Sequence, residues 1–182
     1  MRYMGWTAAV AGLALTAIGV SADGRAVRLA ANLDPLNEVP VVSSPASGRF
    51  SAEINDNDSI DYEISWKDLQ APITQSHIHF AQPNVNGAIV IWLCGTATNP
   101  GPTGTQVCPA ATSSGSVSGT IAPANIIAAT TQGISAGDYA EVVRALRLGL
   151  GYANIHTTGS PGGEIRGQIR ARRAGHEDDD KD

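Results

Sequence analysis

The sequence has little positive charge. Its 182 residues contain 12 lysines and arginines against 17 aspartates and glutamates, which gives a net charge of −5 at pH 7. Proteins that bind nucleic acid or anionic membrane surfaces rely on basic patches for their affinity. The composition therefore argues against nucleic acid or a membrane surface as the main partner.

Long apolar runs are missing after the first 22 residues. These residues start with a basic Arg2, continue through an apolar stretch of about 15 residues and end in the small residues Val20-Ser21-Ala22. Because a membrane-spanning helix needs about 20 apolar residues, we interpret residues 1–22 as a removed secretory signal peptide and not as a membrane anchor. Its removal leaves no membrane span and a net charge of about −6.

Motifs of nucleophilic enzymes are missing as well. The sequence has no G-x-S-x-G segment and no strong carboxylate pair, which favours a protein without enzymatic activity. It has two cysteines, Cys94 and Cys108, which fit a disulfide in a periplasmic or extracellular protein. A metal bound by this cysteine pair is the alternative, but their wide spacing without a nearby histidine is not a usual ligand pattern.

Short alternating strands dominate the chain that remains. Residues 50–54 and 60–66 alternate apolar and polar side chains on either side of a turn at 55–58, which predicts a hairpin. Further strands are predicted over residues 26–33, 75–81, 88–93, 152–157 and 164–169. The strand at 88–93 is apolar on both faces, which predicts a central position in a sheet.

Helix signals are few. The stronger covers Ala136–Leu148, with Ser135 as the candidate N-cap, and the weaker covers Ala122–Ala129. A loop rich in glycine, threonine, serine and proline is predicted over residues 95–119.

The overall pattern predicts a mainly β domain at residues 28–170. We expect an antiparallel β-sandwich or barrel of short strands with one or two short helices. The mixed charges of residues 171–182 leave almost nothing to bury, which predicts a disordered charged tail.

Histidines are clustered. Of the four in the chain, His77 and His79 lie two residues apart in one predicted strand and His156 lies in another. Residues two apart share a strand face, so the three imidazoles can converge on one ion if the strands are neighbours. Copper fits such a site as well as zinc does. The fourth, His176, lies in the charged tail, which we interpret as solvated.

Four other residues are candidates for the same site. Glu38 and Glu164 are candidate oxygen ligands, and Asn154 shares the His156 face and is placed to orient a histidine. Glu164 and Arg166 alternatively pair with each other, because they are neighbours on one strand face. A simpler interpretation is that the histidines hydrogen-bond across strands or to carbonyls, pinning the loop at Pro161–Gly163.

Several segments resemble the motifs of the CHRD domain, the module named after chordin. In the family's order they are Asn37-Glu38-Val39-Pro40-Val41 and residues 76–80, 86–90, 151–157 and 161–169. The resemblance covers roughly residues 28–170 and implies a secreted domain, found alone in microbial proteins, without an agreed activity. Chordin's cysteine-rich modules have no counterpart here, so its antagonism of growth factors is not implied.

The H-x-H strand is also similar to that of copper–zinc superoxide dismutases, which are β-sandwiches. Those enzymes hold two metals with more histidines and an aspartate, whereas this domain has three histidines. The likeness therefore does not predict a dismutase.

These patterns predict a secreted CHRD-domain protein, a non-enzymatic ligand-binding module with copper (or zinc) bound by His77, His79 and His156. Its partners are then a metal ion or an extracellular protein. The alternative is a structural or protein-interaction module of the cell surface or extracellular matrix, whose histidines only brace the fold. An oxidoreductase ranks behind both, because no second metal site or cofactor motif is present.

Overall fold

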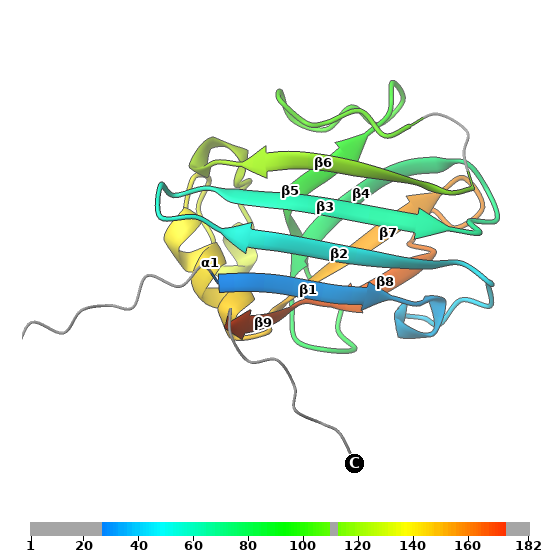
Figure 1. Cartoon of the computed structure of the whole chain (residues 1–182), viewed down its shortest axis with the longest axis horizontal. Helices are drawn as coiled ribbons and strands as arrows, with labels where there is room; N and C mark the ends of the chain where they lie inside the picture. The colour runs from blue at the N-terminus through cyan, green and yellow to red at the C-terminus, as the bar shows by residue number, and fades with distance from the viewer. Residues whose placement is uncertain (1–26, 110–112, 174–182) are drawn as a thin grey trace, which may run out of the picture.

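The protein is a sandwich of two antiparallel sheets (Figure 1). The computed structural model describes residues 27–109 and 113–173. The five-stranded sheet has the order β6 (Gly115–Ile121), β3 (Ile60–Lys67), β2 (Ser47–Ile54), β1 (Val27–Leu33) and β9 (Arg170–Arg173). The four-stranded sheet has the order β5 (Ala88–Gly95), β4 (Ile73–Phe80), β7 (Gly151–Thr157) and β8 (Ile165–Gln168). The predicted mainly β fold is confirmed, and it is a sandwich.

The hairpin of β2 and β3 shows how the sequence pattern builds the core. Phe50 lies opposite Ile64 and Ala52 opposite Tyr62, and all four are buried between the sheets. Ser51 and Glu53 alternate with them and face outward, as the period of two predicts. The core thus forms from one face of each sheet.

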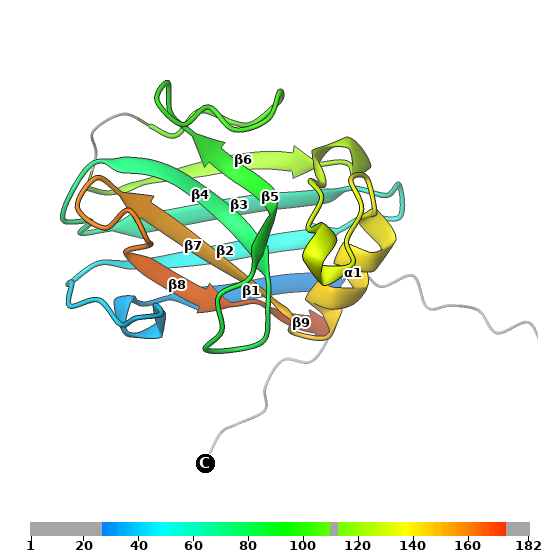
Figure 2. The same ribbon diagram turned by 180° about the vertical axis from the view of Figure 1, so that it is seen from behind.

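The helix is shorter than predicted. α1 covers Tyr139–Arg147, and its N-cap is Asp138, whose carboxylate accepts a hydrogen bond from the backbone NH of Glu141 at 3.3 Å. The N-cap expected at Ser135 is therefore wrong. The weaker helix at 122–129 is also wrong, because only a 3-10 turn forms there, at Pro123–Asn125. Further 3-10 turns lie at Pro35–Asn37 and Thr130–Gln132. α1 covers one end of the sandwich (Figures 1 and 2).

Strand β5 lies at the edge of its sheet, and its predicted central position is wrong. Its buried residues Val90, Ile91 and Leu93 explain the apolar pattern, because loops cover the strand. The backbone NH of Ile127 donates to the Val90 carbonyl at 3.0 Å, which places the segment after β6 against β5. An apolar pattern on two faces therefore indicates a covered strand without indicating a central one.

The disulfide predicted between Cys94 and Cys108 is confirmed, with an S–S distance of 2.06 Å. It ties the loop after β5 to that strand, where the NH of Cys108 also donates to the Gly95 carbonyl at 2.8 Å. The loop expected over residues 95–119 ends earlier, because β6 begins at Gly115.

The end of the described chain crosses from one sheet to the other. After β8, the short strand β9 pairs with β1, so that Arg170 lies opposite Ala30. Residues 171–173 are therefore part of a strand, which corrects the start of the predicted disordered tail. The rest of that tail, residues 174–182, and the predicted signal peptide, residues 1–22, lie outside the described residues. Within the described ranges, no helix is both long and apolar enough to cross a membrane.

Candidate metal centre

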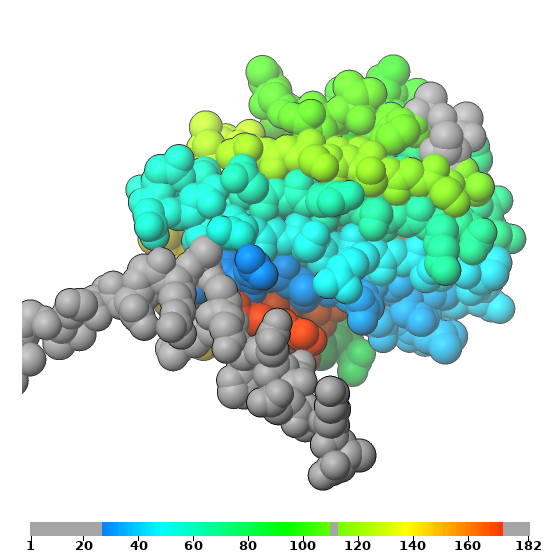
Figure 3. Space-filling model, in the orientation of Figure 1, coloured from blue at the N-terminus to red at the C-terminus, as the bar shows by residue number. Residues whose placement is uncertain are grey.

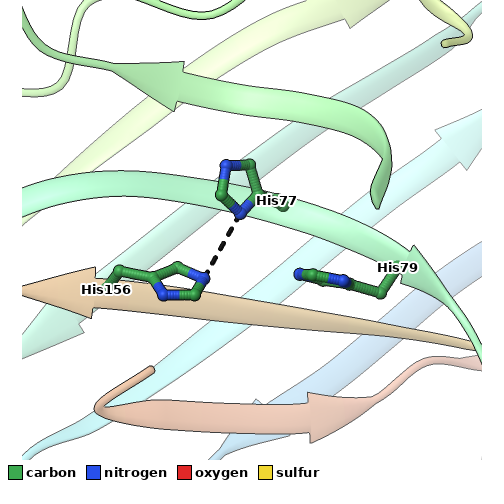
Figure 4. A group of neighbouring side chains, drawn as sticks. All are labelled: His77, His79 and His156. Atoms are coloured by element: carbon green, nitrogen blue, oxygen red, sulfur yellow. Dashed lines mark hydrogen bonds between the residues drawn. The ribbon is translucent and has the colours of Figure 1, made fainter. Parts of the chain in front are cut away.

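Neighbouring strands bring the three histidines together. β4 and β7 pair directly, with His77 opposite Asn154, His79 opposite Tyr152 and Gln75 opposite His156 (Figure 2). Paired residues lie on the same face of a sheet. Because Ile78 faces the core, His77 and His79 lie on the outer face of the four-stranded sheet, together with His156 (Figure 4).

The three imidazoles share one small volume. One ring nitrogen from each residue lies within 4.8 Å of the other two. Three atoms this close have a common point at most about 2.8 Å from each of them, and a zinc–imidazole bond is about 2.0–2.1 Å long. His77 Nδ1 and His156 Nε2 lie 3.3 Å apart.

These histidines are buried although they face away from the core. The exposed fraction is 0% for His77, 8% for His79 and 7% for His156. The Trp92 ring meets His77 edge-on with ring centres 4.2 Å apart, and the Tyr152 ring stacks on His79 at 4.6 Å. Loops and aromatic rings thus close this face of the sheet.

Two backbone carbonyls determine which ring nitrogen carries a proton. His79 Nδ1 lies 2.9 Å from the Gly87 carbonyl, and His156 Nδ1 lies 2.9 Å from the Pro161 carbonyl. A carbonyl only accepts, so both Nδ1 atoms donate and both Nε2 atoms keep a lone pair in the neutral ring. These are the tautomers that metal-binding histidines adopt when a carbonyl orients them.

Burial keeps the rings neutral. It lowers the pKa of His77 to about 2 and that of His79 to about 4, and it also lowers the pKa of His156. The neighbouring histidines lower the pKa of His77 further. Neutral imidazole is the form that binds metal, so the site is electrostatically ready for a cation near pH 7.

His77 has two arrangements open to it. In one tautomer its Nδ1 carries the proton and donates it to the lone pair of His156 Nε2. In the other its Nδ1 carries a lone pair, which points to the volume that the three imidazoles share. In both cases its buried Nε2 has no hydrogen-bond partner among the described residues. The first arrangement is the structural bracing that the sequence left open, and the second is a ligand set.

Asn154 touches the site directly. Its Oδ1 lies 3.1 Å from His79 Nε2, the nitrogen that keeps its lone pair. Asn154 Oδ1 and His79 Nε2 are then both acceptors, and this contact is unfavourable unless a cation lies between them. A flip of the Asn154 amide, which would place its NH₂ group toward His79 as a donor, also removes the conflict. The side chain that was expected to orient a histidine is therefore in contact with one.

Arg166 supports the site from behind Tyr152. Its guanidinium carbon lies 3.4 Å from the centre of the Tyr152 ring. Tyr152 is on β7, which pairs with β4 (His79) on one side and with β8 (Arg166) on the other. The Tyr152 ring therefore lies between Arg166 and His79. Arg166 also donates to Asn86 Oδ1 at 3.0 Å and to the Val85 carbonyl at 2.7 Å. It holds the β4–β5 loop over the histidines.

Glu164 is saturated by other partners. Its Oε1 accepts from Ser44 Oγ at 2.8 Å and from the Gln70 NH at 2.9 Å, and its Oε2 accepts from Thr157 Oγ1 at 2.8 Å. The ion pair with Arg166, which the sequence offered as an alternative, does not form, because each side chain has its own partners. With both oxygens engaged, Glu164 is also poorly placed to ligate.

Glu38 remains available. It is 4% exposed, and its Oε1 has no hydrogen-bond partner among the described residues. Burial raises the pKa of Glu38 to about 7. The positive charge of Arg166 and hydrogen bonds from the Val39 backbone and the Asn154 side chain lower the pKa, but burial outweighs them. Glu38 is thus a buried carboxyl beside the amide that contacts His79.

Sequence reasoning missed Trp92, Tyr152 and the two carbonyls of Gly87 and Pro161. Tyr152 shares the strand face of Asn154 and His156, so its period of two already carried a signal. Trp92 lies on β5, a strand that is apolar on both faces, so alternation gives no signal there. Gly87 and Pro161 lie in loops, which have no period.

Comparison with known proteins agrees with this picture at the level of the family. The model of the CHRD domain family matches residues 29–169. No curated protein matches the sequence. A solved structure, superoxide dismutase 5 of Candida albicans with Cu(II), aligns over 86% of this chain and 99% of its own, with 14% identity and a TM-score of 0.48. That likeness is too distant to bear on function.

Proposed function

The chain belongs to the CHRD domain family, and we propose that it is a secreted, non-enzymatic binding module that holds a copper ion at His77, His79 and His156. The observation that carries the proposal is the convergence of three buried, neutral imidazoles from two paired strands. Two of them have their outer nitrogen tied to a carbonyl. In these two histidines, His79 and His156, the Nε2 atom therefore carries the lone pair that is free to bind a metal.

The distances suit shared coordination. Two nitrogens bound to one ion at about 2.0–2.1 Å lie roughly 3.4 Å apart when the geometry is tetrahedral. His77 Nδ1 and His156 Nε2 are 3.3 Å apart. The other separations are at most 4.8 Å, so they need to close by up to about 1.4 Å for shared coordination. The fold thus comes close to a three-nitrogen site without rearranging its strands.

Copper ranks before zinc because divalent copper binds a given nitrogen site more tightly than zinc does. Glu38 is the carboxylate that we propose as an additional oxygen ligand or as a partner of the ligating groups, since one of its oxygens is buried and has no hydrogen-bond partner in the described part of the chain. The Cys94–Cys108 disulfide supports an oxidising, extracellular or periplasmic location.

A structural or protein-interaction module is the second candidate function. The 3.3 Å separation of His77 and His156 also suits an ordinary hydrogen bond, and His77 is fully buried. In that case the histidines brace β4 against β7 and the ion is not needed.

Calorimetric titration of metal-free protein with Cu(II) and Zn(II) separates the two functions. We expect one equivalent of Cu(II) to bind to the parent and to a His176→Ala control, and no such binding to a His77→Ala/His79→Ala/His156→Ala variant. Absence of binding to the parent, or unchanged binding to the triple variant, would contradict the metal site. A melting temperature that falls equally in the triple variant with and without chelator would favour the structural module.

A further inference from the structure

Asn154 occupies the centre of the histidine cluster. On β7 it lies between Tyr152 and His156 and points to the same face, because residues two apart on a strand share a face. Across the strand pair it lies opposite His77, and His79 is its diagonal neighbour. Its side chain is 2% exposed. Asn154 is therefore the position that adjoins all three histidines.

The amide oxygen of Asn154 is as close to an imidazole nitrogen as a shared ion requires. Oδ1 lies 3.1 Å from His79 Nε2, and His77 Nδ1 lies 3.3 Å from His156 Nε2. Two ligand atoms that bind one ion at about 2.1 Å are roughly 3.0–3.4 Å apart, from square-planar to tetrahedral geometry. Three imidazole nitrogens and one carbonyl oxygen thus form two pairs at ligand spacing.

Glu38 determines which end of the Asn154 amide faces the histidines. Burial raises the pKa of Glu38, and a hydrogen bond from the Asn154 side chain opposes this effect. Because a carboxylate only accepts, Asn154 donates to it through the NH₂ group, and Oδ1 is left for the histidines. A flip of the amide would set Oδ1 against the carboxylate and bury two acceptors face to face.

The Glu38 carboxyl lies outside the cluster of ligand atoms and acts on it through Asn154. Among the described residues, the histidine, cysteine and acidic ligand atoms that lie within 4.8 Å of one another belong to the three histidines and include no carboxylate. On another side, Glu38 Oε1 packs against the backbone of Gly163, where a side chain would collide with it. Gly163 is in the same loop as Pro161, whose carbonyl holds His156 Nδ1.

We propose that Asn154 Oδ1 is the fourth ligand of the metal centre and that Glu38 is the positioning residue that holds this oxygen toward the ion. The inference rests on the proposed function, and it assigns the oxygen ligand to Asn154 instead of Glu38. It also predicts selectivity between oxidation states. Divalent zinc and copper accept a fourth, oxygen ligand, whereas an oxygen contributes little to the binding of the softer Cu(I).

Separate affinities for Cu(II), Zn(II) and Cu(I) test the role of Asn154. Competition against chromophoric chelators gives them at pH 8, where Glu38, with its pKa of about 7, is mostly ionised. We expect Asn154→Ala to bind Cu(II) and Zn(II) about tenfold or more weakly and to bind Cu(I) within about threefold of the parent. A residue that only orients His79 would lower all three affinities together, because His79 binds both oxidation states.

Two variants of Glu38 test its positioning role. Glu38→Gln keeps an oxygen that accepts from Asn154, so Cu(II) affinity should stay within about threefold of the parent. Glu38→Leu removes the acceptor and should weaken Cu(II) binding about tenfold, with no further loss when it is combined with Asn154→Ala, because both changes remove one interaction. A Glu38 that bound the ion itself would lose affinity in both variants, and its loss would add to that of Asn154→Ala.

An exchange of the two groups provides a second test of the ligand. Asn154→Asp/Glu38→Gln keeps one amide and one carboxylate in contact but places the carboxylate at the ion, so we expect Cu(II) to bind at least as tightly as in the parent. Asn32→Ala is the matched control. Asn32 is exposed on β1, on the outer face of the five-stranded sheet, which is turned to the viewer in Figure 3, and its loss should leave every affinity unchanged.

Equal losses of Cu(II) and Cu(I) affinity in Asn154→Ala, or no loss of either, would overturn the inference while the three-histidine site stands. An exchange variant that binds Cu(II) more than about tenfold more weakly than the parent would also overturn it. A parent that binds no Cu(II), or a His77→Ala/His79→Ala/His156→Ala variant that binds it as the parent does, would remove the metal centre and this inference with it.

Discussion

The outer faces of the two sheets carry similar sequence patterns and have opposite environments. On the four-stranded sheet, polar residues such as His77, Asn154 and Arg166 are at most 2% exposed. On the five-stranded sheet, the polar residues Arg28, Asp61 and Glu63 are exposed to water. The difference arises from connections between strands, which cover one face and leave the other bare. Alternation thus predicts which side chains leave the core, and loops decide whether they reach water.

The largest contrast is expected between two glutamates, one on each side of the molecule. Glu164→Gln replaces a carboxylate that accepts from Ser44, Gln70 and Thr157, so that an NH₂ group meets buried donors. We expect a loss of about 2–4 kcal/mol of unfolding free energy, as for other disrupted buried hydrogen bonds to a charged group. Glu63→Gln on the open face should stay within about 0.5 kcal/mol. Urea unfolding measures both, and equal losses would refute the contrast between the faces.

Two asparagines give the next contrast, in metal affinity. Asn154→Ala removes the side chain that lies 3.1 Å from His79 Nε2, and we expect the affinity for Cu(II) to fall by about 10- to 100-fold, as when a group that orients a ligand is lost. Asn32→Ala on the open face should leave the affinity unchanged. Calorimetric titration gives both values. An Asn154 variant that binds copper as the parent does would show that the amide plays no part in the site.

These contrasts show what the sequence could and could not predict. A period of two placed His77, His79 and His156 correctly on paired strand faces, because register follows from alternation. The same period predicted a Glu164–Arg166 pair, but the two side chains diverge, one to Thr157 and the other to Tyr152. The carbonyls of Gly87 and Pro161 and the burial of Glu38 depend on how loops fold back, which no local pattern encodes.

The pH dependence of the metal-free protein tests the closed face as a whole. As pH falls below about 6.5, the unfolded chain protonates its histidines while folded His79 and His77 stay neutral down to pKa values of about 4 and about 2. Stability should therefore decrease toward acid, by about 1.4 kcal/mol per pH unit for each such histidine.

Glu38 acts in the opposite direction. Its pKa is raised to about 7, so its stabilising contribution is complete below about 4.5 and is lost as pH rises through about 7. Glu38→Gln should make the decrease toward acid steeper. Urea unfolding at several pH values between 7 and 5 measures this. A parent whose stability does not change over that range would contradict the neutral, buried state of the histidines.

The smallest effect is expected on the open face. Arg28→Gln removes a long, exposed ion pair with Glu53, so the unfolding free energy should change by less than about 0.5 kcal/mol. Thermal unfolding at low and high salt checks this. A loss above about 1 kcal/mol would mean that this face contributes to stability in the way that the closed face does.

Electron paramagnetic resonance of the protein loaded with one equivalent of Cu(II) tests the central claim most directly. The account predicts nitrogen splittings from three imidazoles, which lose one nitrogen in His156→Ala and are unchanged in His176→Ala. A spectrum without nitrogen ligands, or one that the His77→Ala/His79→Ala/His156→Ala variant reproduces, would contradict it.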